Sequence, residues 1–386
     1  MDKKLHVLLV DGDSRQILPV MKGLHAQKCE ITTVSSHRLA NGFTSRFPDH
    51  KLLFSSGSDD ALFLQILGLV QTRSYDVLIP LSDHSADIVT RHETELARYI
   101  NTAIPNRDIF LRAYDKQQTM ELCMDHGIPC TISKRIQESL SSFVERMGFP
   151  LVAKPRKACG SMGLKIIHNR DELFRMIESG SIDLDSYVIQ EFIPQTGKQI
   201  NVHIILDKNG NMASGVVTEK CRWFPVDGGA SCLCRTIHDP EILAQCLKLL
   251  EVVGWMGYCE IELIVDPRDG LAKVIEINGR ASASIKIMWL AGVNIGEQMV
   301  KTALDEEICP KLDYPDDIRL RRLSADFLWL LQSPDRFRRR PNWFSPVHTH
   351  EATFDIQDPL PFMGTALDLL RRIPNYGKEM EKRSRN

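Results

Sequence analysis

Residues 260–280 read EIELIVDPRDGLAKVIEINGR, and this stretch decides the fold of the second half of the chain. Two apolar runs, residues 260–265 and 272–277, flank the turn sequence DPRDG, so the pattern predicts two antiparallel strands joined by a tight connection. Each run carries one glutamate, Glu262 and Glu276. A carboxylate inside an apolar strand is costly unless a cation compensates for its burial. A metal ion is the natural compensating charge, and a structural ion pair is the alternative.

Pairing of these strands can bring both glutamates to one face, where Asn278 adds an amide oxygen. Two carboxylates and an amide oxygen, completed by triphosphate oxygens and water, suit octahedral Mg²⁺. We therefore expect Glu262, Glu276 and Asn278 to be metal ligands. Arg280 follows directly, and its guanidinium can bind a transferring γ-phosphate or an acyl phosphate formed from it.

A glycine-bearing turn lies further upstream. Lys154 closes the strand predicted at residues 149–155, and the sequence RKACGSMG follows. Gly160, Ser161 and Gly163 allow backbone N–H groups to approach phosphate oxygens, although an ordinary hairpin turn has the same composition. The turn is not a Walker A loop, because GxxxxGK[ST] is absent.

Residues 190–193, QEFI, end another predicted strand and run into Pro194. Such a sheet edge can offer backbone donors and acceptors to an adenine ring. Taken alone, the segment is an ordinary strand end.

The first hundred residues alternate apolar runs with helical stretches. We expect strands at 6–10, 30–36 and 75–81, and helices at 14–26, 61–72 and 87–99. Strands that are apolar on both faces and alternate with helices predict an open, parallel α/β sheet. Ligands bind at the carboxyl ends of such strands, here near residues 11–13 or 80–83, although we favour turn formation and helix capping as the explanation of these residues.

The second half predicts an antiparallel α+β fold. Helices are expected at 115–126, 139–147 and 240–253, and further strands at 164–168, 187–193, 199–206 and 212–217. The remaining 75 or so residues form a small, locally basic C-terminal extension that contains Arg319, Arg321, Arg322 and the run 336–340. A run of this kind is typical of a solvated face, and an anionic partner is the alternative.

Composition excludes several classes of protein. The 48 lysines and arginines are balanced by 50 aspartates and glutamates, so the basic surplus of a nucleic-acid-binding protein is missing. No run of about 18 apolar residues predicts a membrane span, and the start is too short in apolar residues for a signal peptide. Ten cysteines at irregular spacing form no CxxC pair, which indicates free thiols in a reducing cytoplasm.

Four blocks together resemble the ATP-grasp superfamily. They are AYDKQQTMELCMDHGIP with Lys116, FPLVAKPRKACGSMGLKII with Lys154, VIQEFIP, and EIELIVDPRDGLAKVIEINGR. Their order and spacing are similar to that superfamily over roughly residues 105–300, and the likeness is closest to the carbamoyl-phosphate-synthase-like carboxylate–amine ligases.

The resemblance implies roles for individual residues. Lys116 and Lys154 would contact ATP phosphates, with Lys154 and Arg280 acting in catalysis. The hairpin with Gly160, Ser161 and Gly163 would form a flexible lid, and Mn²⁺ could replace Mg²⁺ at the metal ligands. The nucleotide-binding set is completed by Gln190, Glu191, Phe192, Ile193 and Gln199. Lys198 and Gln199 stand where relatives usually carry an acid that binds ribose, and Gln199 can still bond a hydroxyl.

The implied activity is ligation. A carboxylate becomes an acyl phosphate, an amine attacks it, and ADP and phosphate are released. Two alternatives remain: carbamoyl-phosphate formation from bicarbonate and ammonia, and a nucleotide-binding protein without catalysis. One set of motifs and the absence of a recognisable glutaminase nucleophile speak against the first, and the complete set of predicted metal ligands speaks against the second.

Substrate recognition is the least defined part. Arg222, Ser231 and Arg280 are the candidates for binding the small-molecule carboxylate and amine, and Ser282, Ser284 and Lys286 form a weaker set. His203 is predicted to be a structural strand histidine. The sequence does not fix the oligomeric state, but dimers are common among similar proteins, so a homodimer is compatible with the resemblance. The resemblance divides the chain into an N-terminal domain (1–105), an ATP-grasp domain (106–310, with a lid-bearing part 106–186 and a metal-binding part 187–310) and the extension (311–386).

Overall fold

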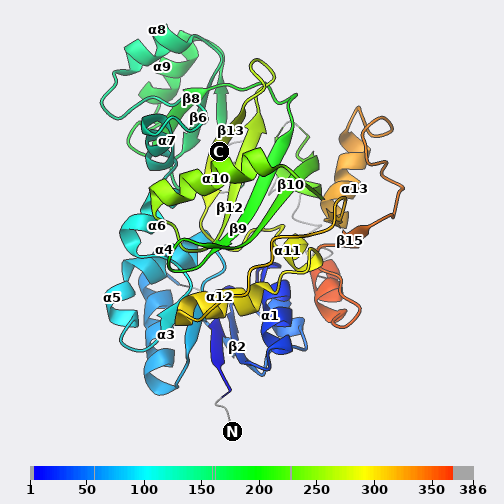
Figure 1. Ribbon diagram of the computed structural model, residues 1–386. Coiled ribbons are helices and arrows are strands. Elements are labelled where there is room, and N and C mark those ends of the chain that lie inside the picture. The colour runs from blue at the N-terminus through cyan, green and yellow to red at the C-terminus, as the bar shows by residue number, and fades with distance from the viewer. Residues whose placement is uncertain (1–3, 56, 159, 161, 227, 368–386) are drawn as a thin grey trace.

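The computed structural model describes residues 4–55, 57–158, 160, 162–226 and 228–367. Three sheets follow one another along the chain (Figure 1). Within the described ranges, no helix has the length and apolar character needed to cross a membrane.

The N-terminal sheet has the order β3-β2-β1-β4-β5, and all of its neighbouring strands are parallel, as predicted. Residues 7–10 alternate between two hydrophobic clusters, one on each face of the sheet, which is why this strand is apolar throughout. The strands are β1 (His6–Leu9), β2 (Glu30–Ser35), β3 (His50–Leu53), β4 (Val77–Ile79) and β5 (Asn101–Thr102).

The helices of this region are α1 (Ile17–Ala26), α2 (Asn41–Thr44), α3 (Asp59–Thr72), α4 (Asp83–Arg91) and α5 (Glu93–Leu96). The single helix predicted at 87–99 is wrong: two helices meet at His92, and the first begins at Asp83 because Ser82 caps it in a reciprocal capping box. Asp11, at the end of β1, accepts hydrogen bonds from the backbone N–H groups of Leu81 and Ser82. These bonds link the segment that follows β1 to the segment that follows β4.

A small antiparallel sheet, β7-β6-β8, carries the glycine-bearing turn. Its strands are β6 (Leu151–Pro155), β7 (Lys165–Ile167) and β8 (Tyr187–Glu191), and its helices are α8 (Leu140–Met147) and α9 (Arg170–Glu178). Phe143, Leu151 and Leu173 are fully buried in a separate cluster beneath this sheet. The three-stranded unit therefore has a small core of its own.

The large sheet has the order β13-β12-β9-β10-β11-β14-β15, with every neighbouring pair antiparallel except β14 and β15. Its strands are β9 (Gln199–Leu206), β10 (Met212–Phe224), β11 (Ala230–Ile237), β12 (Gly257–Val265), β13 (Ala272–Asn278), β14 (Arg319–Arg321) and β15 (Thr349–Glu351). The accompanying helices are α6 (Arg107–Tyr114), α7 (Lys116–Asp125), α10 (Pro240–Val253), α11 (Lys286–Leu290), α12 (Ile295–Leu304) and α13 (Leu323–Gln332).

One hydrophobic cluster joins the two larger sheets. It contains Leu9 and Val20 from the N-terminal region together with Ile205, Met288 and Ile295. Helices α1 and α12 lie side by side between the parallel sheet and the large sheet (Figure 1). This shared core holds the carboxyl ends of β1 and β4 next to the large sheet.

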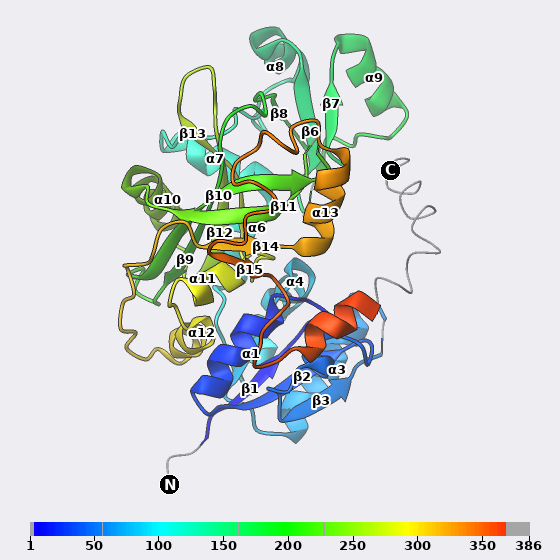
Figure 2. The ribbon, with the colours of Figure 1, turned by 90° about the vertical axis from the view of Figure 1, so that its right-hand side faces the viewer.

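The basic extension is partly integrated into the large sheet, and α13 packs beside β10 and β11 (Figure 2). A fully solvated basic face is therefore wrong for Arg319 and Arg321, whose side chains are 13% exposed and paired with Asp317 and Asp326. The later residues 338–340 are exposed.

Candidate functional site

Two adjoining cavities lie along the large sheet. The larger has a volume of about 700 Å³ and the smaller about 320 Å³. Lys220, Glu262 and Glu276 line both of them. The two cavities therefore meet at these three charged side chains.

The predicted pairing of the two glutamates is confirmed, since Glu262 on β12 lies directly opposite Glu276 on β13. The Glu262 carboxylate accepts from Lys220 Nζ at 2.5 Å and from Asn278 Nδ2 at 3.2 Å, and Lys116 Nζ lies 3.1 Å from Glu276 Oε2. Burial raises the pKa of Glu262 in spite of Lys220. Burial also disfavours the charge of Glu276, but Lys116 and Lys154 outweigh it and lower the pKa of that carboxyl.

This all-oxygen donor set fits a divalent cation. Two carboxylates from adjacent strands and the Asn278 amide oxygen, which accepts from Arg280 Nη2 at 3.0 Å, are the ligand types that Mg²⁺ takes. In this structure, Lys220 neutralises Glu262 and Lys116 neutralises Glu276.

A bulge in β13 helps to position Lys154. The register passes from Glu262–Glu276 directly to Leu263–Val274, so Ile275 is an extra residue. Its carbonyl accepts from Lys154 Nζ at 3.2 Å. Burial lowers the pKa of Lys154 to about 8, with Glu276 opposing this effect and Lys116 adding to it.

The glycine turn lies over the junction. Lys116 Nζ donates to Ala158 O at 2.5 Å, and Ala158 and Met162 line both cavities, whereas Gly160 lines the larger one. Gly163 has a positive φ, and a β-carbon at this position would lie only 2.8 Å from the Pro155 ring, so a side chain there would be strained. The prediction for Ser161 lies outside the described residues.

The smaller cavity is lined by the predicted hinge segment. Gln190 Nε2 donates to Thr131 Oγ1 at 2.9 Å and to Ser133 Oγ at 2.6 Å. Gln199 Nε2 donates to Gln195 Oε1 at 3.0 Å. The cavity is also lined by Glu191 and by the apolar side chains of Phe192, Ile193, Val152, Leu164, Ile166 and Ile264.

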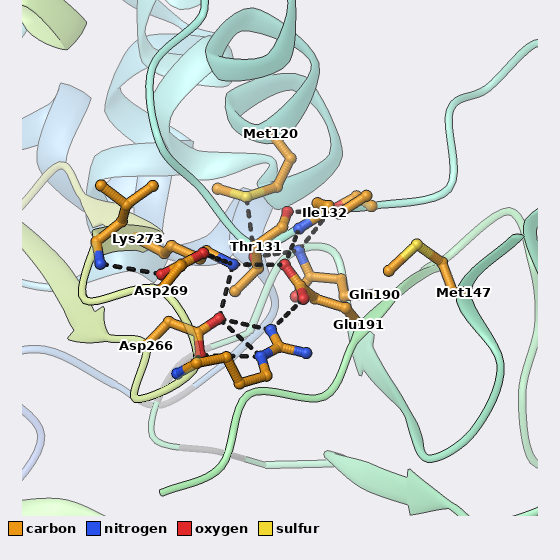
Figure 3. A network of polar contacts seen from close by, with 12 residues as sticks. Met120, Thr131, Ile132, Met147, Gln190, Glu191, Asp266, Asp269 and Lys273 are labelled. Carbon is orange, nitrogen blue, oxygen red and sulfur yellow. Dashed lines mark hydrogen bonds and ion pairs between the residues drawn. The ribbon is translucent and has the colours of Figure 1, made fainter. Parts of the chain in front are cut away.

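The Glu191 side chain is held in a network that the sequence did not reveal (Figure 3). Its carboxylate pairs with Arg268 and lies 3.4 Å from Lys273 Nζ, and both cations also bond Asp266. Asp266 and Arg268 belong to the DPRDG turn, and Lys273 follows it on β13. The alternating charges of this turn were the signal available in the sequence. The network therefore holds the Glu191 side chain, and with it this part of the hinge segment, in place.

In the larger cavity, Arg280 Nε donates to Asp83 Oδ2 at 3.0 Å, which ties β13 to the start of α4. Ser231 and Ser284 also line this cavity, and Ser284 Oγ donates to Glu260 Oε2 at 2.8 Å. Arg15 and Arg322 line it as well and were not predicted.

The substrate role predicted for Arg222 is contradicted. Its guanidinium is 2% exposed and makes two bonds to Asp326, at 2.5 and 2.9 Å, and a third to the carbonyl of Pro341. The reason is a bulge at Cys221: Lys220 lies opposite Cys234, but Arg222 lies opposite Leu233. The extra residue turns Arg222 to the face away from Lys220.

Two members of the weaker set are also structural. Lys286 Nζ donates to the carbonyls of Glu351 and Phe354, and Ser282, 1% exposed, accepts from the Tyr258 hydroxyl. His203 is fully buried on β9, as predicted, with Nδ1 2.9 Å from the Tyr258 hydroxyl. Burial lowers its pKa.

Residues 115–310, half of the chain, match the family model of the carbamoyl-phosphate synthase L chain, ATP binding domain. The chain belongs to this family. The match confirms the resemblance to the carbamoyl-phosphate-synthase-like branch of the ATP-grasp superfamily. All of the predicted metal ligands lie inside the matched segment of this ATP-binding domain, whereas Arg15 and Arg322 lie outside it.

The carbamoyl phosphate synthase large chain of Neisseria meningitidis serogroup B is 24% identical over 247 residues, covering 56% of this chain. Our chain spans 23% of that relative, about a quarter of its length.

Two solved structures share the fold. The biotin carboxylase domain of Hydrogenobacter thermophilus 2-oxoglutarate carboxylase, a dimer complexed with MgADP, ADP and bicarbonate, has a TM-score of 0.70 at 16% identity, covering 82% of this chain and 74% of that one. Staphylococcus aureus N5-carboxyaminoimidazole synthetase, complexed with ADP, has a TM-score of 0.62 at 14% identity, covering 80% of each chain. These likenesses support a parallel N-terminal sheet followed by a mixed sheet in the family arrangement.

Proposed function

We propose that the protein is an ATP-dependent ligase that activates a carboxylate as an acyl phosphate and joins it to an amine, releasing ADP and phosphate. The observation that carries this proposal is the meeting of two cavities at Lys220, Glu262 and Glu276, with Lys154 and Arg280 beside them. The smaller cavity would take the nucleotide base and the larger one the acceptor. Membership of the ATP-binding family supports the same assignment.

Residue by residue, the nucleotide would be held by the predicted set. Hinge backbone at Glu191 and Ile193 would hold adenine, and Gln199 would face the ribose. Glu262, Glu276 and Asn278 would hold Mg²⁺, or Mn²⁺ in its place, and the metal when bound would neutralise charge on the phosphate oxygens. Lys116 and Lys154, now paired with or facing Glu276, would then turn to the phosphates.

The chemistry proposed for this site needs charge neutralisation rather than an acid–base pair. A carboxylate oxygen bonds to the γ-phosphorus as the bond to the β–γ bridging oxygen breaks. The amine nitrogen then bonds to the acyl carbon, phosphate leaves, and the amine loses a proton. Each cation–phosphate pair at about 4 Å is worth about 4 kcal/mol at an effective dielectric near 20, before desolvation. Arg280, oriented by Asp83 and Asn278, would stabilise the transferring group.

Nucleotide binding is tested by the thermal stability of the protein with MgATP, with MgGTP as the control. At about 100 times the dissociation constant, MgATP should add about 2.7 kcal/mol of stability. No stabilisation by either nucleotide would contradict the proposed nucleotide site, whereas stabilisation by MgATP without ADP release from any carboxylate–amine pair would favour the non-catalytic alternative.

Turnover is tested by ADP release across a panel of carboxylate–amine pairs. We expect Glu276→Gln and Lys154→Met each to lower turnover at least about 100-fold, because each removes a preorganised charge. Exposed Glu145→Gln and Lys208→Met are matched controls, since both side chains lie outside the two cavities. Near-normal turnover in both site variants would refute these roles.

The similarity to carbamoyl phosphate synthase keeps one alternative activity open, namely carbamoyl phosphate formation from bicarbonate and ammonia. ADP release that depends on bicarbonate without any other carboxylate would support it.

We also propose the domain division at 105/106, 186/187 and 310/311. The end of the parallel sheet at β5 supports the first boundary, whereas β8 completes the small sheet and β14 and β15 join the large sheet, so these two sheets extend across the other boundaries. A homodimer is proposed because a similar structure is described as a dimer. Free thiols are consistent with the predicted cytoplasmic location: in the described part of the chain no cysteine forms a disulfide, and all but Cys309 are buried.

A further inference from the structure

Three arginines from separate parts of the chain line the larger cavity. Arg15 precedes α1 in the N-terminal region, Arg280 follows β13, and Arg322 links β14 to α13 in the basic extension. Only Arg280 belongs to the segment that matches the ATP-binding family. Arg15 and Arg322 add positive charge to the lining of the larger cavity, the proposed acceptor site.

Among the described residues, no carboxylate forms an ion pair with Arg15. Arg15 Nε donates to the neutral carbonyl of Ala283 at 3.3 Å. Glu351 is close enough to favour its charge, but Glu351 Oε2 already accepts from the backbone N–H groups of Thr353 and Phe354 and from the Thr353 hydroxyl. Burial and the nearby guanidiniums of Arg322 and Arg280 lower the pKa of Arg15 to about 10, so it stays charged at neutral pH.

The acids of the same cavity already have partners among the described residues. Asp83 pairs with Arg280, Glu262 with Lys220, and Glu276 with Lys116. The rest are equally engaged: Asp87 with Arg107, Asp59 with Arg91, and Glu260 with Ser284 and His203. A half-buried guanidinium that faces two others is stabilised when an anion enters.

We propose that the carboxylate substrate carries a second anionic group, which Arg15 and Arg322 bind while the carboxylate to be activated lies at Arg280. This inference rests on the proposed ligase function for the role of Arg280. A planar guanidinium binds a carboxylate or a phosphate in a bidentate manner, so either group satisfies the site. A cavity of about 700 Å³ has room for such a compound beside an amine.

The experiment measures the affinity of probe acids by thermal shift and calorimetry, with and without MgADP. Acetate and butyrate carry one charge, succinate and glutarate carry two carboxylates, and 3-phosphoglycerate carries a carboxylate and a phosphate. We expect at least one dianion to bind about 10-fold or more tightly than the monoacid of similar length. The stronger of the two dianion classes identifies the second group.

Arg15→Gln and Arg322→Gln should each abolish most of this preference while leaving monoacid affinity unchanged. Arg15→Lys should be intermediate, because it keeps the charge and loses the planar fork. Arg38→Gln, an exposed arginine in the loop after β2, is the matched control and should preserve the preference. Using both positions keeps the test valid if one variant fails to fold.

The inference is overturned if the wild-type protein binds no dianion better than the monoacids, or if both glutamine variants retain the preference. The MgATP shift is recorded in the same samples. Its loss in the wild type would contradict the proposed function, whereas an intact shift with no dianion preference would overturn only this inference.

Discussion

Lys154 is a buried lysine whose pKa depends on the charged groups around it in the site. It is 7% exposed, it faces Lys116 as well as two glutamates, and burial lowers its pKa to about 8. Before a ligand enters, Lys154 therefore loses its proton as the pH rises through about 8. A bound phosphate favours the protonated amine, so binding raises this pKa again.

The first prediction concerns this proton. MgATP affinity should fall above pH 8, and binding at about pH 8.5 should take up protons, because the complex holds a proton that the unliganded site has lost. Calorimetry in two buffers of different ionisation enthalpy measures the uptake. Lys154→Met should remove both effects, and the same uptake in this variant would assign the proton to another group.

Among the secondary-structure elements, the bulge in β10 decides which side chains reach the site. Lys220 and Arg222 would share a face in a regular strand, but Cys221 is extra, and only Lys220 lines the cavities. Arg222 instead joins Arg321 on the fully buried Asp326, and the two guanidiniums lie over the Trp329 and Trp343 rings respectively. Because of the bulge, Arg222 does not reach the cavities and instead binds Asp326, which attaches α13 to β10.

The anchor gives a stability prediction. Asp326→Ala should cost about 3–5 kcal/mol of unfolding free energy, since it leaves buried guanidiniums without their carboxylate. The double variant Arg222→Met, Asp326→Leu should recover part of this loss and keep the MgATP shift. Urea denaturation measures the free energy of unfolding of both variants, and a thermal scan with MgATP measures the shift. Exposed Asp313→Ala is the control. A loss of probe-acid binding in Arg222→Met at unchanged stability would restore the substrate role.

The same elements show what the sequence could predict. The opposition of Glu262 and Glu276 follows from two local signals, a short turn and alternating apolar residues, and it was correct. The direction of Arg222 depends on an inserted residue that no local pattern marks. Arg15 and Arg322 are brought to the cavity by tertiary packing, so their spacing in the sequence carries no signal. The charges of the DPRDG turn are visible in the sequence, but they do not show that Glu191 is the partner of Arg268 and Lys273.

On the scale of the whole molecule, the basic extension completes the large sheet. β14 pairs with β11, and the buried Asp326 and the partly buried Trp343 from the same segment pack against β10 and β11. Removing residues 311–386 would open this sheet edge and leave Arg222 without its partners. We expect the truncated chain to unfold at a clearly lower temperature or to aggregate, as light scattering during a thermal scan would reveal. An equally stable truncated chain would mark the extension as dispensable for folding.

The pair formed by Lys220 and Glu262 lies where the two cavities meet, and this position makes the cavities thermodynamically dependent on each other. A cation that bound Glu262 together with the nucleotide would replace Lys220 as the partner of this carboxylate. The Lys220 ammonium would then be able to pair with a group in the larger cavity. An anionic acceptor then gains a cation that it lacked before. Linkage makes the effect reciprocal, so the acceptor strengthens nucleotide binding by the same factor. Under the proposed function, the position of this pair would therefore favour the complex with both substrates over the complexes with either one alone.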